Sequence, residues 1–141
     1  MQEESRSRVG WFFRHEGDMM PSTPMLFDFD RWGQCDEAIV AEEDGEILGV
    51  VTLASNGIEN SGQPTLDTLY VPKRHCGMGL GYALFERGIR RLADRRPNDN
   101  INCDLQSSIM LKLVAKLPDD LKSRLQIQES FRSGDLAEDF E

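Results

Sequence analysis

The stretch VPKRHCGMGLGYALFERGIRRL, from Val71 to Leu92, decides the fold of this chain. In its middle, glycines at positions 77, 79 and 81 alternate with larger residues, and an amphipathic run follows at once. A glycine-rich turn that opens a helix leaves backbone N–H groups without intrahelical partners, next to the positive end of the helix dipole. The pattern therefore predicts a cradle for phosphate oxygens. A tight turn whose glycines serve packing alone is the alternative.

Regular elements are predicted on both sides of these glycines. Apolar residues recur at helical spacing from Leu80 to Leu92, and Pro97 ends the helix. Before the glycines, Thr65–Val71 alternates polar and apolar residues as a half-buried strand does. A strand, a phosphate-binding turn and a helix thus follow one another.

A hairpin is predicted upstream. The β-branched runs Ala38–Glu42 and Glu46–Ala54 flank Asp44-Gly45, which suits a type I′ turn because both central residues there need positive φ. Closer to the N-terminus, Arg8–Gly17 fits a first strand as well as a first helix.

Alternating elements are predicted downstream. Ile101–Gln106 fits a strand, Ser107–Leu117 fits a helix with a serine cap, and Ser123–Ser130 fits a last strand. Strands and helices that alternate in this way indicate a small α/β or α+β sandwich. We expect one domain over residues 1–130 and an acidic C-terminal tail over residues 131–141.

Composition excludes several classes of function. The chain has 141 residues and a net charge of −9, from 16 Lys and Arg against 25 Asp and Glu. Nucleic-acid binding needs clustered cations, so the acidic chain favours cationic partners such as amines. No apolar stretch has the length of a signal core or a membrane span, which predicts a cytoplasmic protein that does not bind membranes. Neither a metal cluster nor a paired set of cysteines is visible.

Two common nucleotide-binding motifs do not fit the glycine turn. A Walker loop needs Gly-Lys before Ser or Thr, yet Gly79 and Gly81 are followed by Leu80 and Tyr82. A dinucleotide fingerprint needs a third glycine where Tyr82 stands, and it follows the first strand of a βαβ unit instead of a hairpin.

The segment LYVPKRHCGMGLGYAL resembles the GCN5-related N-acetyltransferase superfamily, in which a hairpin, a strand, a glycine loop and a helix follow in this order. The resemblance implies a mixed, mostly antiparallel central sheet flanked by helices, with acetyl-CoA as co-substrate. Two registers are open: Arg74-x-x-Gly77-x-Gly79 satisfies the short motif, whereas pairing all three glycines with those of the family fits the loop length. We favour the second, which places Cys76 where the family usually has Arg or Gln.

The resemblance also implies residue roles. Backbone groups of the turn would hold the pyrophosphate of acetyl-CoA, the strand would pair with its pantetheine arm, and the Val71 N–H would polarise the thioester carbonyl. Lys73, Arg74 or His75 would replace the positive charge that Cys76 lacks. The residues expected to bind the co-substrate are Leu69, Val71, Cys76, Gly77, Met78, Gly79, Leu80 and Gly81.

Acyl transfer also needs a base and, in this family, often an acid. Asp67 matches a position where the family often carries a carboxylate that acts through water, although strand alternation alone also explains a polar residue there. The usual tyrosine is missing, because the matching position is Val114. Alternation predicts that Tyr70 points to the face opposite to Asp67. Asp28 and Asp30 are candidates for a pocket that holds a cationic amine.

These observations favour an N-acetyltransferase that moves an acetyl group to a primary amine by direct attack. A catalytically silent acetyl-CoA-binding regulator of a protein partner is the rival, supported by the missing tyrosine. An interaction domain without a nucleotide is the third hypothesis, and it requires glycines that serve packing alone. The acceptor and the oligomeric state are not encoded in any motif that we find.

Overall fold

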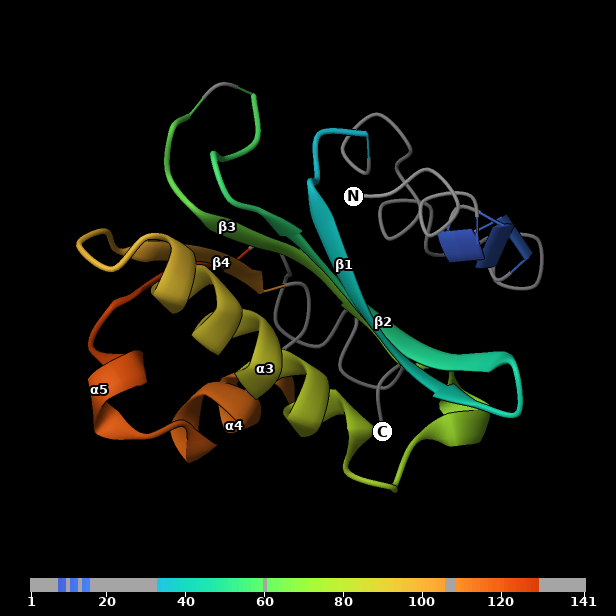
Figure 1. Cartoon of the computed structure of the whole chain (residues 1–141). Helices are drawn as coiled ribbons and strands as arrows, with labels where there is room; N and C mark the ends of the chain where they lie inside the picture. Colours follow the sequence, from blue (N-terminus) through green and yellow to red (C-terminus); the bar gives the residue numbers. More distant parts are fainter. Residues whose placement is uncertain are drawn as a thin grey trace.

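The structure, a computed structural model, describes residues 8–9, 11–12, 14–15, 33–59, 61–105 and 109–129. These residues form a five-stranded sheet in the order β1-β2-β3-β4-β5, with helices α3, α4 and α5 packed together on one side (Figure 1). The elements are β1 (Glu37–Glu43), β2 (Glu46–Ala54), β3 (Thr65–Tyr70), α3 (Leu80–Arg95), β4 (Ile101–Leu105), α4 (Ile109–Lys116), α5 (Asp119–Lys122) and β5 (Leu125–Glu129).

The first three strands are antiparallel, and β1 and β2 form the predicted hairpin. Its turn has φ of 51° at Asp44 and 84° at Gly45, which are the two positive values that a type I′ turn requires. Aspartate tolerates this backbone conformation better than most residues, and glycine adopts it freely. The hairpin prediction is confirmed.

The other half of the sheet is parallel. After β3 the chain passes through α3 to β4, and then through α4 and α5 to β5, which pairs with β4 over its whole length. Most of the paired residues lie in the antiparallel ladders, so the predicted fold class, a mixed and mostly antiparallel sheet flanked by helices, is confirmed.

The main core lies between the sheet and the helices. The apolar face of α3 contributes Phe85, Ile89 and Leu92, all fully buried against β2 and β3. Gly88 belongs to the same face, where a Cβ atom would stand 3.2 Å from Leu53 Cδ2 and 3.3 Å from Leu66 Cδ1. The helix is thus pressed closely onto the sheet, and this contact fixes where its N-terminal turn lies.

A second, smaller core covers the opposite face of the sheet. Val50, Ala54 and Tyr70 contribute to it from the strands, and Val9 and Phe12 contribute from the N-terminal segment. The described residues between 8 and 15 are helical, which decides the alternative between strand and helix in favour of the helix. Two layers of side chains therefore sandwich the central strands.

Ion pairs connect the start of β1 to the end of α3. Glu37 binds Arg91 at 2.9 Å and Arg95 at 2.5 Å, and Asp36 binds Arg95 at 3.1 Å. Asp36 Oδ1 also accepts a hydrogen bond of 2.8 Å from the Ser55 backbone N–H. Burial by itself would raise the pKa of Asp36, but the hydrogen bonds from Ser55 and the charge of Arg95 outweigh it, so this pKa lies below 3.8.

A lowered pKa predicts how Asp36 contributes to stability. The contribution is complete above the unfolded-state pKa of 3.8 and is lost as the pH falls through the lower folded-state value. We expect Asp36→Asn to lower the free energy of unfolding at pH 7 by less than about 1 kcal/mol, because the side chain is partly solvated. The free energies of unfolding of the two proteins, measured by urea denaturation, should converge at acidic pH. Asp120→Asn, which alters an exposed carboxylate on α5, is the control. Its free energy of unfolding should not approach that of the native protein as the pH falls, because the two should be similar at pH 7 already.

The remaining expectations about the fold have different outcomes. The helix after the glycines and the strands at 101–105 and 125–129 are confirmed, whereas α5 was not predicted. The serine cap at Ser107, the carboxylates Asp28 and Asp30, and the tail over residues 131–141 lie outside the described residues. Among the described helices, none has the length and apolar character of a membrane span.

Candidate functional site

The ladder between β3 and β4 stops after two residue pairs, Thr65 with Asn102 and Leu66 with Cys103. Beyond Leu66 the two parallel strands have no further paired residues, although β2 continues to pair with β3 up to Tyr70. Within the described part of the chain, no strand therefore pairs with the β4-facing edge of β3 over residues 67–70. An extended ligand can pair with such an edge through its own polar groups.

Asp67 lies where the ladder stops, and it is the extra residue of a β-bulge. Thr52 pairs with Thr68, but the next residue, Leu53, pairs with Leu66. A bulge changes the direction of side chains along a strand and is frequent next to active sites. The sequence shows alternation through this segment, and alternation alone does not reveal a bulge.

The bulge overturns one expectation about Tyr70. Asp67 Oδ2 lies 3.9 Å from the Cys35 Sγ donor, and Cys35 belongs to the same small core as Tyr70. Asp67 and Tyr70 therefore share one face of the sheet, and the prediction that they point to opposite faces is wrong. The Thr68 hydroxyl also donates to Asp67 Oδ2 at 3.2 Å. Two donors thus surround a carboxyl group that is 4% exposed.

The glycine turn has the backbone geometry that an anion site needs. Gly77 and Gly79 have φ of 92° and 75°, and Gly79 is the N-cap of α3. No side chain caps this end of the helix, and its first turn contains no acidic residue. The first intrahelical bond runs from Ala83 N to Gly79 O, so the N–H groups of Leu80, Gly81 and Tyr82 have no helical partner.

A cavity of about 200 Å³ joins this turn to the end of β3. It brings together seven of the nine predicted site residues, while Asp67 and Met78 do not line it, and the Met78 side chain is 57% exposed. The cavity also has a wall from α4 that we did not predict. Its lining is Leu69, Val71, His75, Cys76, Gly77, Gly79, Leu80, Gly81, Tyr82, Met110, Leu113 and Lys116.

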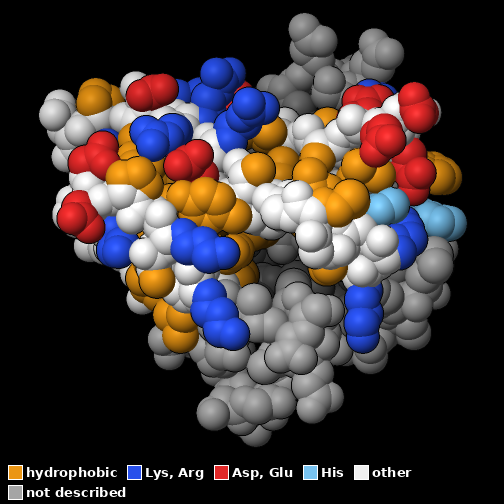
Figure 2. Space-filling model, turned by 90° about the horizontal axis from the view of Figure 1, so that it is seen from below, with side chains coloured by type: hydrophobic (Ala, Val, Ile, Leu, Met, Phe, Trp, Pro, Cys, Tyr) orange, Lys and Arg blue, Asp and Glu red, His pale blue; other side chains and the backbone are white. Residues whose placement is uncertain are grey.

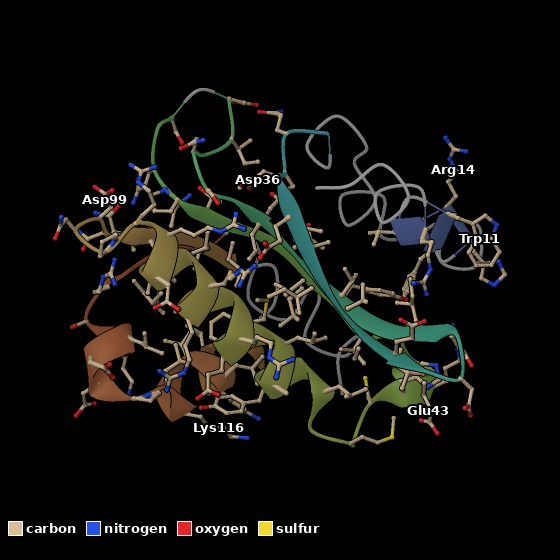
Figure 3. All side chains as sticks on the ribbon, in the orientation of Figure 1. Trp11, Arg14, Asp36, Glu43, Asp99 and Lys116 are labelled. Atoms are coloured by element: carbon tan, nitrogen blue, oxygen red, sulfur yellow. The ribbon has the colours of Figure 1, made fainter. Side chains whose placement is uncertain are left out.

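Lys116 provides a cationic group at this cavity, and the His75 ring also lines it, with its Nε2 3.3 Å from Glu46 Oε1. Lys116 lies at the end of α4, with its Nζ 5.9 Å from the centre of the Tyr82 ring (Figure 3). The Tyr82 hydroxyl donates to the Lys116 carbonyl at 3.1 Å and to Glu86 at 3.3 Å. Desolvation and the Glu86 charge raise the pKa of Tyr82 above 10.0, so this phenol keeps its proton. Lys116 lies two residues after Val114, and it was not among the predicted site residues.

Of the three residues proposed to replace the charge that is missing at position 76, Lys73 and Arg74 do not line the cavity. Lys73 and Arg74 lie in the short 3₁₀ turn that precedes Cys76, and Arg74 lines a different cavity. The Cys76 thiol donates to the Pro72 carbonyl at 3.5 Å and to the Val71 carbonyl at 3.7 Å. Cys76 therefore supports the bend before the glycines and contributes no charge.

The larger cavity, of about 680 Å³, lies beside the hairpin turn. Its walls include Trp11, Phe12 and His15 from the N-terminal segment and Asp44 and Glu46 from the hairpin. The Phe12 ring lies 6.0 Å from that of Tyr70, which places this wall on the Asp67 face of the sheet. The larger cavity is not the candidate site, because the glycine turn lines the smaller one.

Two further observations concern the chemistry. Val114 is buried in the main core, so the position at which the family has its tyrosine carries no acid here. Within the described ranges, no group of three or more His, Cys, Asp or Glu side chains is placed to hold a metal ion.

A family model described as "Acetyltransferase (GNAT) family" matches residues 7–106. These residues include the hairpin, β3, the glycine turn, α3 and β4. Searches among curated proteins and among solved structures found no match.

Proposed function

The chain belongs to the GNAT family of acetyltransferases, and on this premise we propose that it transfers the acetyl group of acetyl-CoA to a primary amine on a small molecule or a protein. One observation carries the proposal: the end of the β3–β4 pairing, the glycine turn and the Lys116 cation meet at one cavity. Each feature suits a different part of acetyl-CoA.

The turn would bind the pyrophosphate. The free N–H groups at the start of α3 point along the helix axis, and the helix dipole favours an anion there. Lys116 adds positive charge from the cavity wall, which offsets the absence of Arg or Gln at position 76.

The edge of β3 that β4 leaves without a ladder over residues 67–70 would bind the pantetheine arm. Its amides can bond to the strand in place of β4, and the arm would then lead to Val71 at the end of the strand. There the Val71 N–H would polarise the thioester carbonyl. The amine nitrogen attacks the carbonyl carbon, the C–S bond breaks, and the sulfur leaves with its electron pair as coenzyme A thiolate. The proton that the nitrogen still has to lose after the attack passes through water to this thiolate, which gives coenzyme A thiol.

Asp67 is the proposed base. It would take the proton of the amine through a water molecule, because an ammonium group has no lone pair with which to attack. The hydroxyl of Thr68 and the thiol of Cys35 donate to the carboxylate and hold it in place. The amine would come from the Asp67 face, where the larger cavity lies, and the net charge of −9 favours a cationic acceptor.

A silent acetyl-CoA sensor is the competing hypothesis, and the buried Val114 in place of a tyrosine favours it. A coenzyme A thiolate is a tolerable leaving group, so the missing acid does not exclude turnover. The two hypotheses share the cavity and differ only in whether a panel of amines is acetylated.

The experiment that tests the proposal measures the melting temperature with acetyl-CoA, and with ATP and NAD as controls. At 100 times its dissociation constant, acetyl-CoA should add about 2.7 kcal/mol to stability, a shift of several degrees, and the controls should add little. Release of coenzyme A in the presence of amines then separates the enzyme from the sensor. Absence of any shift at millimolar acetyl-CoA would contradict both.

The same assay tests the glycine turn. Gly79→Ala places a side chain at φ 75°, with a strain of about 1–2 kcal/mol that the turn can relieve by rotating its N–H groups away from the ligand. We expect acetyl-CoA binding at least about tenfold weaker. Gly62→Ala is the matched control, since Gly62 also has φ 75° but lies in the loop before β3. If both variants bind acetyl-CoA like the native protein, the turn is not the phosphate site.

A further inference from the structure

The hydroxyl group of Tyr82 connects the two helices that border the smaller cavity. Tyr82 lies in the first turn of α3, directly after the glycines, and its hydroxyl donates to the backbone carbonyl of Lys116 at 3.1 Å. Lys116 is the last residue of α4. Both residues line the cavity, so a single side chain joins the start of α3 to the last turn of the wall that α4 forms.

The end of α4 takes its hydrogen-bond donors from side chains. The last carbonyl groups of a helix have no partner within it, and Pro118, which follows α4, has no N–H group. Lys122 Nζ donates to the carbonyl of Ala115 at 3.1 Å, and Tyr82 donates to the next carbonyl, that of Lys116. The last turn of α4 is therefore held by two side chains, one of which comes from the glycine-rich end of α3.

The ring of Tyr82 also lies near the charged group of Lys116. Lys116 Nζ is 5.9 Å from the centre of the ring, and a cation within about 6 Å of an aromatic ring centre is attracted to its face. Figure 3 shows the labelled lysine at the end of α4. A lysine side chain loses much conformational entropy when a ligand fixes it. A contact that restrains the ammonium group beforehand reduces that loss and strengthens binding.

The charges around the smaller cavity favour an anion near Lys116. Among the described residues that line the cavity, none is Asp or Glu. Glu86 accepts a hydrogen bond from Tyr82 at 3.3 Å and pairs with Arg90 at 3.6 Å, but it does not line the cavity. Figure 2 shows the molecule from below, where red Asp and Glu side chains gather at the left and right and the middle holds orange and blue ones. An anion in the cavity would therefore meet Lys116 with no described carboxylate in the wall.

We propose that Tyr82 is a positioning residue for Lys116, and that through Lys116 it sets the affinity for the pyrophosphate of acetyl-CoA. The inference rests on the proposed function, since it requires that the smaller cavity binds this co-substrate. The hydroxyl holds the backbone of Lys116 and the ring restrains its ammonium group, so the cation is in place before the ligand arrives. Tyr82 itself needs no contact with acetyl-CoA, because its hydroxyl already donates to Lys116 and Glu86.

A purely structural role for Tyr82 is the alternative. Met110 and Val114 are buried in the main core and attach α4 to the rest of the protein without the phenol. The hydrogen bond from Tyr82 lies at the exposed end of α4, so its loss should change the position of Lys116 more than the stability of the fold. The two roles are separable, because only the positioning role depends on the charge of Lys116.

The test measures the dissociation constant of acetyl-CoA by isothermal titration calorimetry, for the full chain and its variants. Lys116→Gln removes the cation and should weaken binding about tenfold. Tyr82→Phe keeps the ring but removes the hydroxyl, and it should weaken binding about three- to tenfold, which corresponds to one hydrogen bond. In the double variant, Tyr82→Phe should cause no further loss, because no ammonium group remains to be positioned.

Ser123→Ala is the matched control. The Ser123 hydroxyl donates to the Asp120 carbonyl at 3.2 Å at the end of α5 and does not line the cavity, so its removal should leave the dissociation constant unchanged. Native affinity in either single variant would overturn the proposal. So would a loss from Tyr82→Phe that is as large beside Lys116→Gln as it is alone, because Tyr82 would then act without Lys116. A native protein that does not bind acetyl-CoA would contradict the proposed function itself, and this inference with it.

Discussion

Asp67→Asn is expected to lower the turnover of amine acetylation by about 10²–10⁴-fold, because a positioned general base contributes a factor of this size. The amide is nearly isosteric and can still accept a hydrogen bond from Thr68, but it takes no proton from the amine. The melting-temperature shift produced by acetyl-CoA should remain as in the native protein, since Asp67 does not line the cavity. The measurement is the initial rate of coenzyme A release with a primary amine.

Two comparisons make this prediction decisive. Thr68→Val removes one donor to Asp67 and should lower turnover by a smaller factor, of about tenfold, whereas Asp120→Asn should leave it unchanged. An Asp67→Asn protein that retains the native rate would show that Asp67 is a polar strand residue and nothing more. If the native protein binds acetyl-CoA but acetylates no amine, the protein is the silent sensor.

Phe85→Ala is expected to lower the free energy of unfolding by about 3–5 kcal/mol, the usual cost of removing a buried aromatic ring. Phe85 is fully buried, where α3 lies against β2 and β3. Denaturation in urea measures the effect, and Phe85→Leu is the control that keeps most of the apolar volume and should lose much less. A loss below about 1 kcal/mol for the alanine variant would mean that α3 is not anchored as described.

The same variant connects stability with the site. The N–H groups of the turn belong to α3, which Ile89 and Leu92 still bury against the sheet when Phe85 is removed, so acetyl-CoA should stabilise the weakened protein as it stabilises the native one. At 100 times the dissociation constant this recovers about 2.7 kcal/mol. If acetyl-CoA no longer shifts the melting temperature of a folded Phe85→Ala protein, the turn has moved with the helix.

The parts of the fold that depend on neighbours in sequence were predictable. Asp44-Gly45 specifies the hairpin because few other residue pairs adopt positive φ at both positions. The amphipathic spacing from Leu80 to Leu92 likewise specifies α3 and the face that it buries. The glycine turn was predictable because the residues that shape it are consecutive.

The parts of the site that depend on distant residues were not. The bulge at Asp67 exists because β3 has one more residue than β2 needs there, and register between strands leaves no mark in either segment alone. Lys116 reaches the cavity from α4, far along the chain from the glycines. The charge missing at position 76 is an example. We sought its replacement in the three residues before Cys76, and of these only His75 lines the cavity.

The sheet divides the site into two sides, which meet where β3 and β4 stop pairing. The glycine turn and α4 lie on one side of it, and Asp67 with the N-terminal aromatic residues lies on the other. If donor and acceptor bind as proposed, they would not need to share an entrance, and both could be present at once. Residues that select the amine could then change in evolution without change to those that hold the common donor. One half of such a protein would diversify while the other is inherited unchanged.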